Sequence, residues 1–169
     1  GLKTGSLFTS AVKDRQTLIS SLRAINARLV PRGLRMLPLR YQGGRVLLYM
    51  VRPARLKADL SDELAKSILS HKAYPVGHPE RCIVELARRL KENPEFPHEI
   101  GLFLGYPPED IHGFIVNTAK GAKYVGCWKV YGDEEKARQK FQLYKKCTRV
   151  YCECFRRDRS FDRLVVAVS

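Results

Sequence analysis

The sequence predicts an α/β fold, bordering on α+β, with a mixed sheet of about five strands covered by helices. Two patterns support this prediction. The segment 34–52 contains two apolar runs on either side of a glycine pair, which is typical of an antiparallel hairpin. The segment 101–131 reads as strand, helix and strand, and a crossover of that length predicts a right-handed parallel βαβ unit. We expect residues 1–169 to form a single domain.

The hairpin pattern also predicts the position of its two strands in the sheet. The run at 45–52 is apolar without alternation, which indicates a strand covered on both faces. The run at 34–41 contains Pro38, which removes a donor from the ladder and favours an edge strand or a bulge. A short β-branched run at 164–168 predicts a last strand.

Apolar residues recur at three- and four-residue spacing in most of the remaining chain, which predicts helices. Residues 2–8 are interpreted as the end of an earlier helix. A short helical segment is expected to start at Pro53. A second short helix is predicted over 108–116, and further helices are predicted over 10–30, 61–71, 79–93 and 133–155.

The net charge of +14 is concentrated at the two ends of the chain. Residues 1–60 contain 12 Lys and Arg against 2 acidic residues, whereas residues 61–132 contain 9 of each. A basic surface of this kind can bind nucleic acid or another anionic partner. Arginines crowd the hairpin, and arginine favours bidentate contact with phosphate or carboxylate. We therefore consider five anion-binding candidates: Arg35, Arg40, Arg45, Arg52 and Arg55. The alternative is that charge protects an edge strand against aggregation.

The five cysteines show no disulfide framework, which favours a reducing, cytoplasmic location. No C-x-x-C pair is present. Cys127 and Cys147 become candidate metal ligands if the last long helix packs over the strand that carries Cys127. The alternative is that these cysteines are small buried hydrophobic residues.

A histidine near a cysteine is the minimum that a thiol enzyme requires. His98, followed by Glu99, is the best acid–base candidate, and Cys127 is the candidate nucleophile, although we expect it in the middle of a strand. Satisfied structural histidines are the alternative interpretation of the same residues.

Aromatic residues gather in the same part of the chain. Tyr106, Trp128 and Tyr131 are candidates to line a planar cofactor, and the alternative is that they belong to the core. The sequence contains no G-x-G-x-x-G, P-loop, G-x-S-x-G or H-E-x-x-H motif, and no cofactor is specified by it.

Several segments resemble one family. They are FPHEIGLFLGYPPEDIHGFI, GCWKVYGDEEKA and YKKCTRVY, together with GLKTGSLF and GLRMLPLR…LLYMVRPARL. They are similar to the uncharacterised family catalogued as domain of unknown function 3793, and the resemblance extends over essentially the whole chain. It implies a cytoplasmic bacterial protein and no particular activity. Family members usually begin with a His-Cys-Ala-Pro-Thr-like segment upstream of the position of Gly1, so we expect this chain to lack a short native segment.

Three hypotheses for function follow. The first is a non-catalytic binding or regulatory module with a basic surface for an anionic partner. The second is a thiol-dependent enzyme with a Cys/His pair, and the third is a metal-binding or planar-cofactor-binding protein. No apolar run is long enough to span a membrane. The sequence does not specify an oligomeric state.

Overall fold

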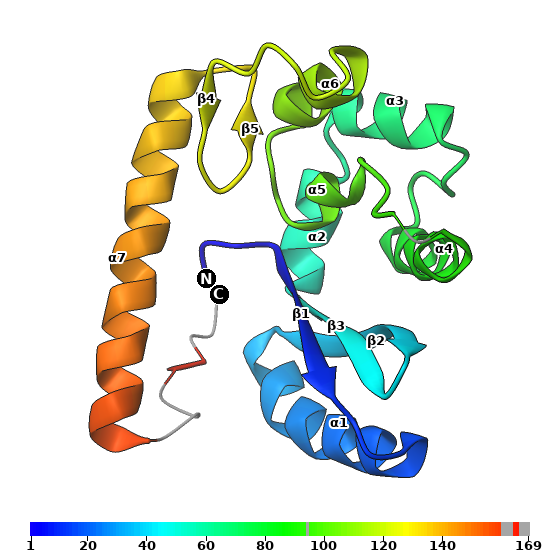
Figure 1. The fold of residues 1–169 in the computed structure, drawn as a ribbon, viewed down its shortest axis with the longest axis vertical. Coiled ribbons are helices and arrows are strands. Elements are labelled where there is room, and N and C mark those ends of the chain that lie inside the picture. Colours follow the sequence, from blue (N-terminus) through cyan, green and yellow to red (C-terminus); the bar gives the residue numbers. More distant parts are fainter. Residues whose placement is uncertain (94, 160–163, 166–169) are drawn as a thin grey trace.

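The structure is a computed structural model that describes residues 1–93, 95–159 and 164–165. Its main sheet has three antiparallel strands in the order β1-β3-β2 (Figure 1). These strands are β1 (Gly5–Ala11), β2 (Arg35–Gln42) and β3 (Arg45–Val51). The predicted hairpin is confirmed as β2 and β3, and β3 has the central position that its apolar sequence indicates. The register of β2 shifts between Pro38 and Arg40, as expected for a proline in an edge strand.

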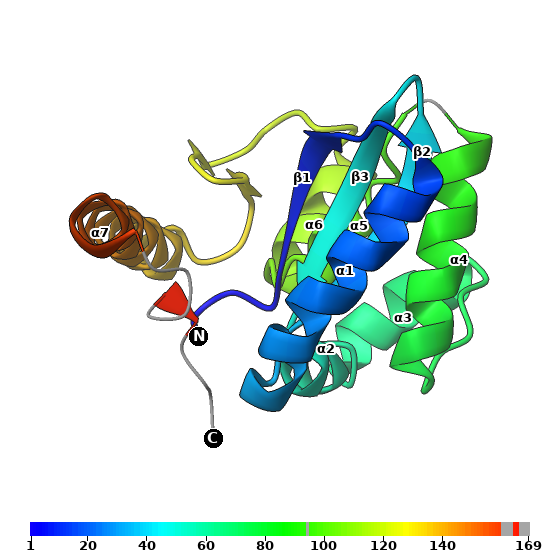
Figure 2. The same ribbon diagram turned by 90° about the horizontal axis from the view of Figure 1, so that it is seen from below.

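Helices cover both faces of this sheet (Figure 2). On one face lies α1 (Arg15–Leu29), followed by the short 3₁₀ helix η1 (Val30–Arg32). On the other face lie α2 (Pro53–Asp59), α3 (Glu63–His71) and α4 (Pro79–Glu92). Each face has its own apolar cluster, in which Leu22 and Val46 belong to the first and Tyr49 and Leu86 to the second. Burial of these two clusters fixes the sheet between its helices.

Aspartates fix the start of three helices. Asp14 accepts a hydrogen bond from the backbone N–H of Thr17 at 2.8 Å and caps α1. Asp62 caps α3 and Asp133 caps α7 (Glu134–Asp158) in the same way. These side chains satisfy donors that the first helical turn leaves unpaired, so the helices begin where aspartate precedes them.

The predictions for residues 1–30 were wrong in two places. Residues 2–8, interpreted as the end of a helix, belong mostly to the edge strand β1, and α1 starts at Arg15 rather than at residue 10. The strand is polar, with the sequence GSLFTSA, and lacks the apolar content of a buried strand. Its pairing partner, β3, lies about forty residues away, so the local sequence does not reveal it.

The predicted parallel βαβ unit and the five-stranded mixed sheet are also wrong for the part of the chain that the structure describes. Residues 101–106 do not form a strand, because Ile100–Phe103 form the single turn α5 and Gly105 follows with a φ of +77°. After α6 (Pro108–Val116), the second expected strand is a small antiparallel hairpin, β4 (Tyr124–Val125) and β5 (Lys129–Val130). The fold is therefore a mixed α+β arrangement with antiparallel sheets of three and two strands.

The last helix, α7, flanks the rest of the molecule (Figures 1 and 2). Its first half buries Ala137, Phe141 and Tyr144 against the β4–β5 hairpin, and its second half exposes more of its apolar residues. Among the described helices, none has an apolar stretch of the length that crossing a membrane requires. The predicted strand at 164–168 lies mainly outside the described residues, and Leu164 and Val165 are not in a strand.

Candidate functional site

A cavity of about 280 Å³ lies where three separate segments meet: the loop at 96–101, helix α6 and the tip of the β4–β5 hairpin. We call it the aromatic cavity, because four of its lining residues carry aromatic rings besides His98. Its lining residues are Phe96, Pro97, His98, Ile100, Gly101, Tyr106, Asp110, Ile111, Phe114, Cys127, Trp128 and Lys129. Four sequence candidates, His98, Tyr106, Cys127 and Trp128, therefore share one cavity.

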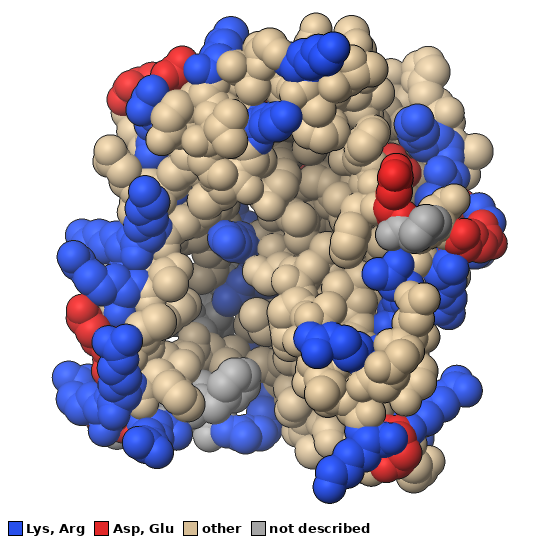
Figure 3. Space-filling view, viewed as in Figure 1, with Lys and Arg blue, Asp and Glu red and all other residues tan. Residues whose placement is uncertain are grey.

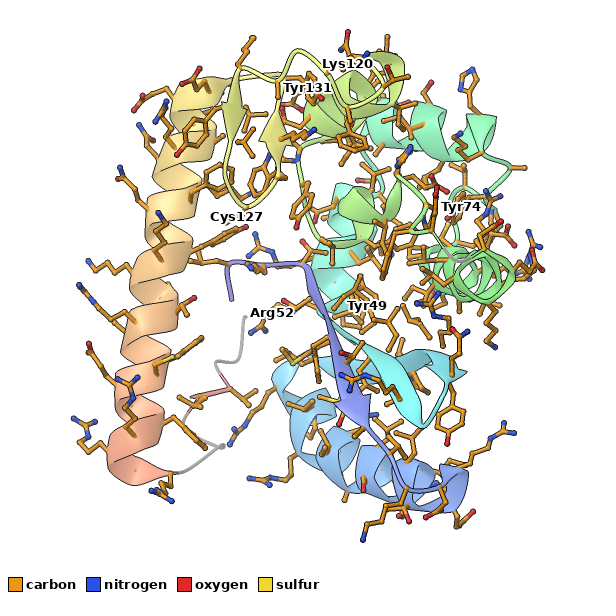
Figure 4. All side chains as sticks on the ribbon, in the orientation of Figure 1. Tyr49, Arg52, Tyr74, Lys120, Cys127 and Tyr131 are labelled. Atoms are coloured by element: carbon orange, nitrogen blue, oxygen red, sulfur yellow. The ribbon has the colours of Figure 1, made fainter. Side chains whose placement is uncertain are left out.

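The hairpin tip presents Cys127 to solvent, as labelled in Figure 4. Gly126 precedes it and lies so close to Phe141 that an added Cβ would fall 2.2 Å from that ring. Trp128 follows it and is buried. Because both neighbours are fixed by packing, the thiol is held at the rim. Cys127 is thus not in the middle of a strand, as the sequence predicted, but in the turn between two short ones.

Trp128 forms part of the wall through an aromatic cluster. Its ring stacks on Tyr106 with centroids 4.6 Å apart and meets Phe141 edge-on at 4.4 Å. Tyr106 and Phe141 therefore cover part of the Trp128 ring. A ligand in the cavity would contact the part of the ring that these two residues leave uncovered. Burial and the nearby Cys127 raise the pKa of Tyr106, which therefore stays a neutral phenol.

Asp110 supports this wall from beneath and is 2% exposed. Its Oδ2 accepts a hydrogen bond from Trp128 Nε1 at 2.7 Å. Its Oδ1 accepts hydrogen bonds from the backbone N–H groups of Tyr131 at 2.7 Å and Gly132 at 2.8 Å. One carboxylate therefore ties α6 to both the tip and the base of the hairpin. Each bond to a charged acceptor is stronger than a neutral one, which makes Asp110 a structural anchor.

The opposite side of the aromatic cavity is made by His98 and Phe114. The imidazole ring of His98 meets the ring of Phe114 edge-on, with centroids 5.1 Å apart, and His98 remains exposed. Lys129 Nζ donates a hydrogen bond to the carbonyl of Ala119 at 2.7 Å. The site thus combines apolar walls with an imidazole ring and a thiol at its edge.

Glu99 does not accompany His98 into the aromatic cavity. It is 3% exposed, accepts a hydrogen bond from the hydroxyl of Tyr74 at 3.0 Å and pairs with Arg89 at 3.6 Å. Burial and the charge of Glu99 raise the pKa of Tyr74 well above its usual value. Glu99, Arg89 and His98 line a second, polar cavity of about 360 Å³. The two residues that the sequence paired as acid–base candidates therefore share the polar cavity, in which Tyr74 and Arg89 hold the carboxylate of Glu99.

The other sequence candidates lie elsewhere. Tyr131 packs over Gly113 on α6 and is not among the residues that line the aromatic cavity. Cys147 lies on α7 and lines a different cleft, so it does not face Cys127 across a common cavity. Among the described residues, no group of three or more His, Cys, Asp and Glu side chains is placed to hold a metal ion.

The five hairpin arginines are divided among several places. Arg35 and Arg45 lie at opposite ends of the β2–β3 ladder. Arg40 donates a hydrogen bond to the carbonyl of Leu90 at 3.0 Å, and Arg45 donates one to the hydroxyl of Thr9 at 3.1 Å. Arg52 is buried, and Arg55 donates a hydrogen bond to the carbonyl of Gly1.

Sequence reasoning missed Asp110 and Phe114. The sequence places Asp110 in the first turn of a helix after two prolines, which indicates an interaction with the helix dipole. A signal for its real role was present in Trp128, because a buried indole N–H usually needs an acceptor. Phe114 lies within the helix predicted over 108–116, and its apolar side chain gives no local signal of a cavity.

Comparison with known proteins gives a family but no function. No curated protein and no solved structure matches the chain. The model of one family, described as a protein of unknown function (DUF3793), matches residues 1–165. The chain belongs to this family of proteins of unknown function, as its sequence resemblance indicated.

Proposed function

We propose that this chain binds a small, flat and largely apolar molecule in the aromatic cavity and that Cys127 bonds or orients it. One observation carries the proposal: His98 and Cys127, which are 29 positions apart in the sequence, line the same aromatic cavity. A concave apolar site with a few convergent polar groups is the usual form of a small-molecule site. At about 280 Å³, the cavity has room for on the order of nine water-sized groups, or one substituted ring.

The chemistry assigned to the site follows from its polar groups. Cys127 is the nucleophile, because it is exposed at the rim while its neighbours are fixed. His98 is the proton-transfer group on the far side of the ligand, which fits its exposed position against Phe114. Tyr106, Trp128 and Phe114 provide the apolar surface. This proposal is a binding function that uses a thiol, and it needs neither Glu99 nor Cys147.

The experiment compares two thiol reagents on the purified chain. Iodoacetamide is small, whereas N-phenylmaleimide carries a ring that fits the aromatic cavity. Cys152 on α7 is the internal control, because it is also exposed but is not among the lining residues. Mass spectrometry after short exposures gives the labelling ratio of Cys127 to Cys152 for each reagent. We expect the aryl reagent to raise this ratio about tenfold, the effect of burying most of a ring.

A matched variant tests the same claim. Phe114→Ala removes one apolar wall without touching the thiol, so it should abolish the preference for the aryl reagent and leave iodoacetamide labelling unchanged. If the labelling ratio of Cys127 to Cys152 is the same for both reagents and does not change in Phe114→Ala, the aromatic cavity is ruled out as the binding site.

A further inference from the structure

A cleft between α7 and the main sheet is separate from both the aromatic cavity and the polar cavity. It has a volume of about 340 Å³. Its walls come from the N-terminal segment, the end of β3 with Arg52, and the inner side of α7. In Figure 3 the molecule is hollowed between α7 and the remaining helices, and Lys and Arg side chains are visible inside the hollow. Figure 4 places Arg52 near the centre of the molecule, facing this gap. We call this space the cationic cleft.

Among the described residues that line the cationic cleft, the charged side chains are all positive. Lys3 and Arg52 line it, and no Asp or Glu occurs among the described residues of its lining. Arg55 lies close enough to Arg52 for the two positive charges to interact. Thr4, which also lines the cleft, donates a hydrogen bond to the carboxylate of Asp59. Positive charges that converge in a partly enclosed space produce a local potential that attracts anions.

Arg52 is the central group, because its side chain is 8% exposed. Burial lowers the pKa of the guanidinium, and the neighbouring Arg55 lowers it further while Tyr151 raises it. A desolvated cation gains more from an anionic partner than an exposed one does. An incoming anion would therefore add a strong contact to those that Arg52 already makes. A planar guanidinium also matches carboxylate and phosphate oxygens in geometry.

The rest of the cationic cleft is apolar or aromatic. Leu29, Leu34, Met50 and Val51 form the side toward the sheet. Tyr144 and Tyr151 form the side toward α7, and Lys3 Nζ lies 4.8 Å from the centre of the Tyr144 ring. Burial raises the pKa of Tyr144 to about 12, so its hydroxyl remains a neutral donor near Lys3. A purely inorganic anion would leave this apolar surface in water, whereas a ligand with an apolar body would cover it.

We propose that the cationic cleft binds a small amphipathic anion, with a carboxylate or phosphate head at Arg52 and Lys3 and an apolar body against the tyrosines and the sheet. The space accommodates on the order of eleven water-sized groups, which suits a short acyl or alkyl chain. The site is too small for a nucleic-acid duplex. Of the arginines that the sequence indicated, the site uses Arg52, with Arg55 close enough to add to the positive potential, and it is independent of Cys127.

Calorimetric titration of the whole chain with four probes tests this proposal. The two charged amphiphiles are used below their micelle-forming concentrations. The probes are decyl phosphate, decanoate, decanol and inorganic phosphate. We expect decyl phosphate or decanoate to bind at least tenfold more tightly than both decanol and inorganic phosphate, because only the charged amphiphiles use both halves of the cleft. The stronger of the two identifies the head group. Equal affinity for decanol, equal affinity for inorganic phosphate, or no binding at all would overturn the proposal.

Variants localise the binding. Arg52→Gln should weaken the charged amphiphile by more than tenfold, and Arg52→Lys, which keeps the charge, should restore part of the affinity. Because Arg52 is buried and its loss can disturb folding, Lys3→Gln provides the second test: Lys3 is exposed, and we expect about a fivefold loss. Lys120→Gln, an exposed lysine outside the cleft, is the matched control and should bind like the unchanged chain. If Lys3→Gln binds as tightly as Lys120→Gln, or if an oligonucleotide binds through Lys3 and Arg52 while decyl phosphate does not, the proposal is wrong.

Discussion

At the scale of single residues, Asp110 anchors one wall of the aromatic cavity. Its carboxylate accepts three hydrogen bonds, from Trp128 Nε1 and from the backbone N–H groups of Tyr131 and Gly132. All three donors lie in or beside the hairpin, and the acceptor belongs to α6. The position of Cys127 therefore depends on a residue 17 positions earlier that makes no bond to it.

We predict that Asp110→Ala destabilises the chain by about 3 kcal/mol, because it leaves buried donors without an acceptor. Asp110→Asn should cost less, since its amide oxygen can still accept from the two backbone groups. Urea unfolding followed by the fluorescence of Trp128 measures both. The neighbouring Glu109→Gln, at an exposed position, serves as control. If Asp110→Ala lowers the free energy of unfolding no more than Glu109→Gln does, the role of Asp110 as an anchor is contradicted.

At the scale of elements, α7 divides into two halves with different environments. The first half buries Ala137, Phe141 and Tyr144, and Asp133 caps its start by accepting a hydrogen bond from Lys136 N–H at 3.0 Å. In the second half Val150 is 44% and Phe155 is 48% exposed. Packing, rather than helix propensity, supplies most of the stability of a helix in a protein.

We therefore predict that amide protection along α7 is uneven. Amides of residues 137–144 should exchange with solvent more slowly, by about tenfold or more, than those of residues 147–155, because local opening is easier where few apolar contacts must break. Hydrogen exchange followed by mass spectrometry on the native chain gives both values. Uniform protection along the whole helix would mean that its second half is covered in solution, for example by a second chain.

At the scale of the whole molecule, tyrosines in the separate apolar clusters make the free energy of unfolding depend on pH. Burial raises the pKa of Tyr49, Tyr74, Tyr106 and Tyr144, and for Tyr144 the value is about 12. The folded chain thus keeps these protons at pH values where the unfolded chain, with tyrosine pKa values of about 10, has released them. The unfolded state then binds fewer protons, so stability falls as pH rises above about 10 and is unaffected by these groups below it.

We predict a decline of about 1.4 kcal/mol per pH unit for each tyrosine that stays protonated in the folded state. Urea unfolding between neutral pH and about pH 11 measures the decline. Tyr74→Phe should reduce the slope by the contribution of one tyrosine. A slope in Tyr74→Phe equal to that of the unchanged chain would show that Tyr74 does not contribute to the decline.

The sequence predicted best what local patterns decide. The β2–β3 hairpin follows from its glycine pair, its apolar second strand and Pro38, and the helices α2, α4 and α6 begin at the predicted prolines Pro53, Pro79 and Pro108. The βαβ prediction failed because a short apolar run such as GLFLGY has no periodicity that separates a strand from one buried helical turn. Gly101 packs against Ile111 of α6, a contact between elements that no local pattern reveals.

The candidate site could be predicted in composition but not in arrangement. Histidine, aromatic and thiol residues in 96–132 indicated a site, and four of these candidates, His98, Tyr106, Cys127 and Trp128, line one cavity. His98 and Glu99, paired in the prediction, both line the polar cavity, but Glu99 is held by Tyr74 and Arg89 and does not line the aromatic cavity. The division of the hairpin arginines depends on which end of the ladder each one occupies, which is a property of register.

The measurement that tests the central claim most directly uses the single tryptophan of the chain. In a ¹H–¹⁵N spectrum Trp128 gives one indole resonance, from the N–H that donates to Asp110 at the wall of the aromatic cavity. The probe is N-phenylsuccinimide, the unreactive analogue of the aryl reagent. We predict that this resonance moves and saturates as the probe is added, and that it stays in place in Phe114→Ala. An unmoved indole resonance at the highest probe concentration in the unchanged chain would contradict binding in the aromatic cavity.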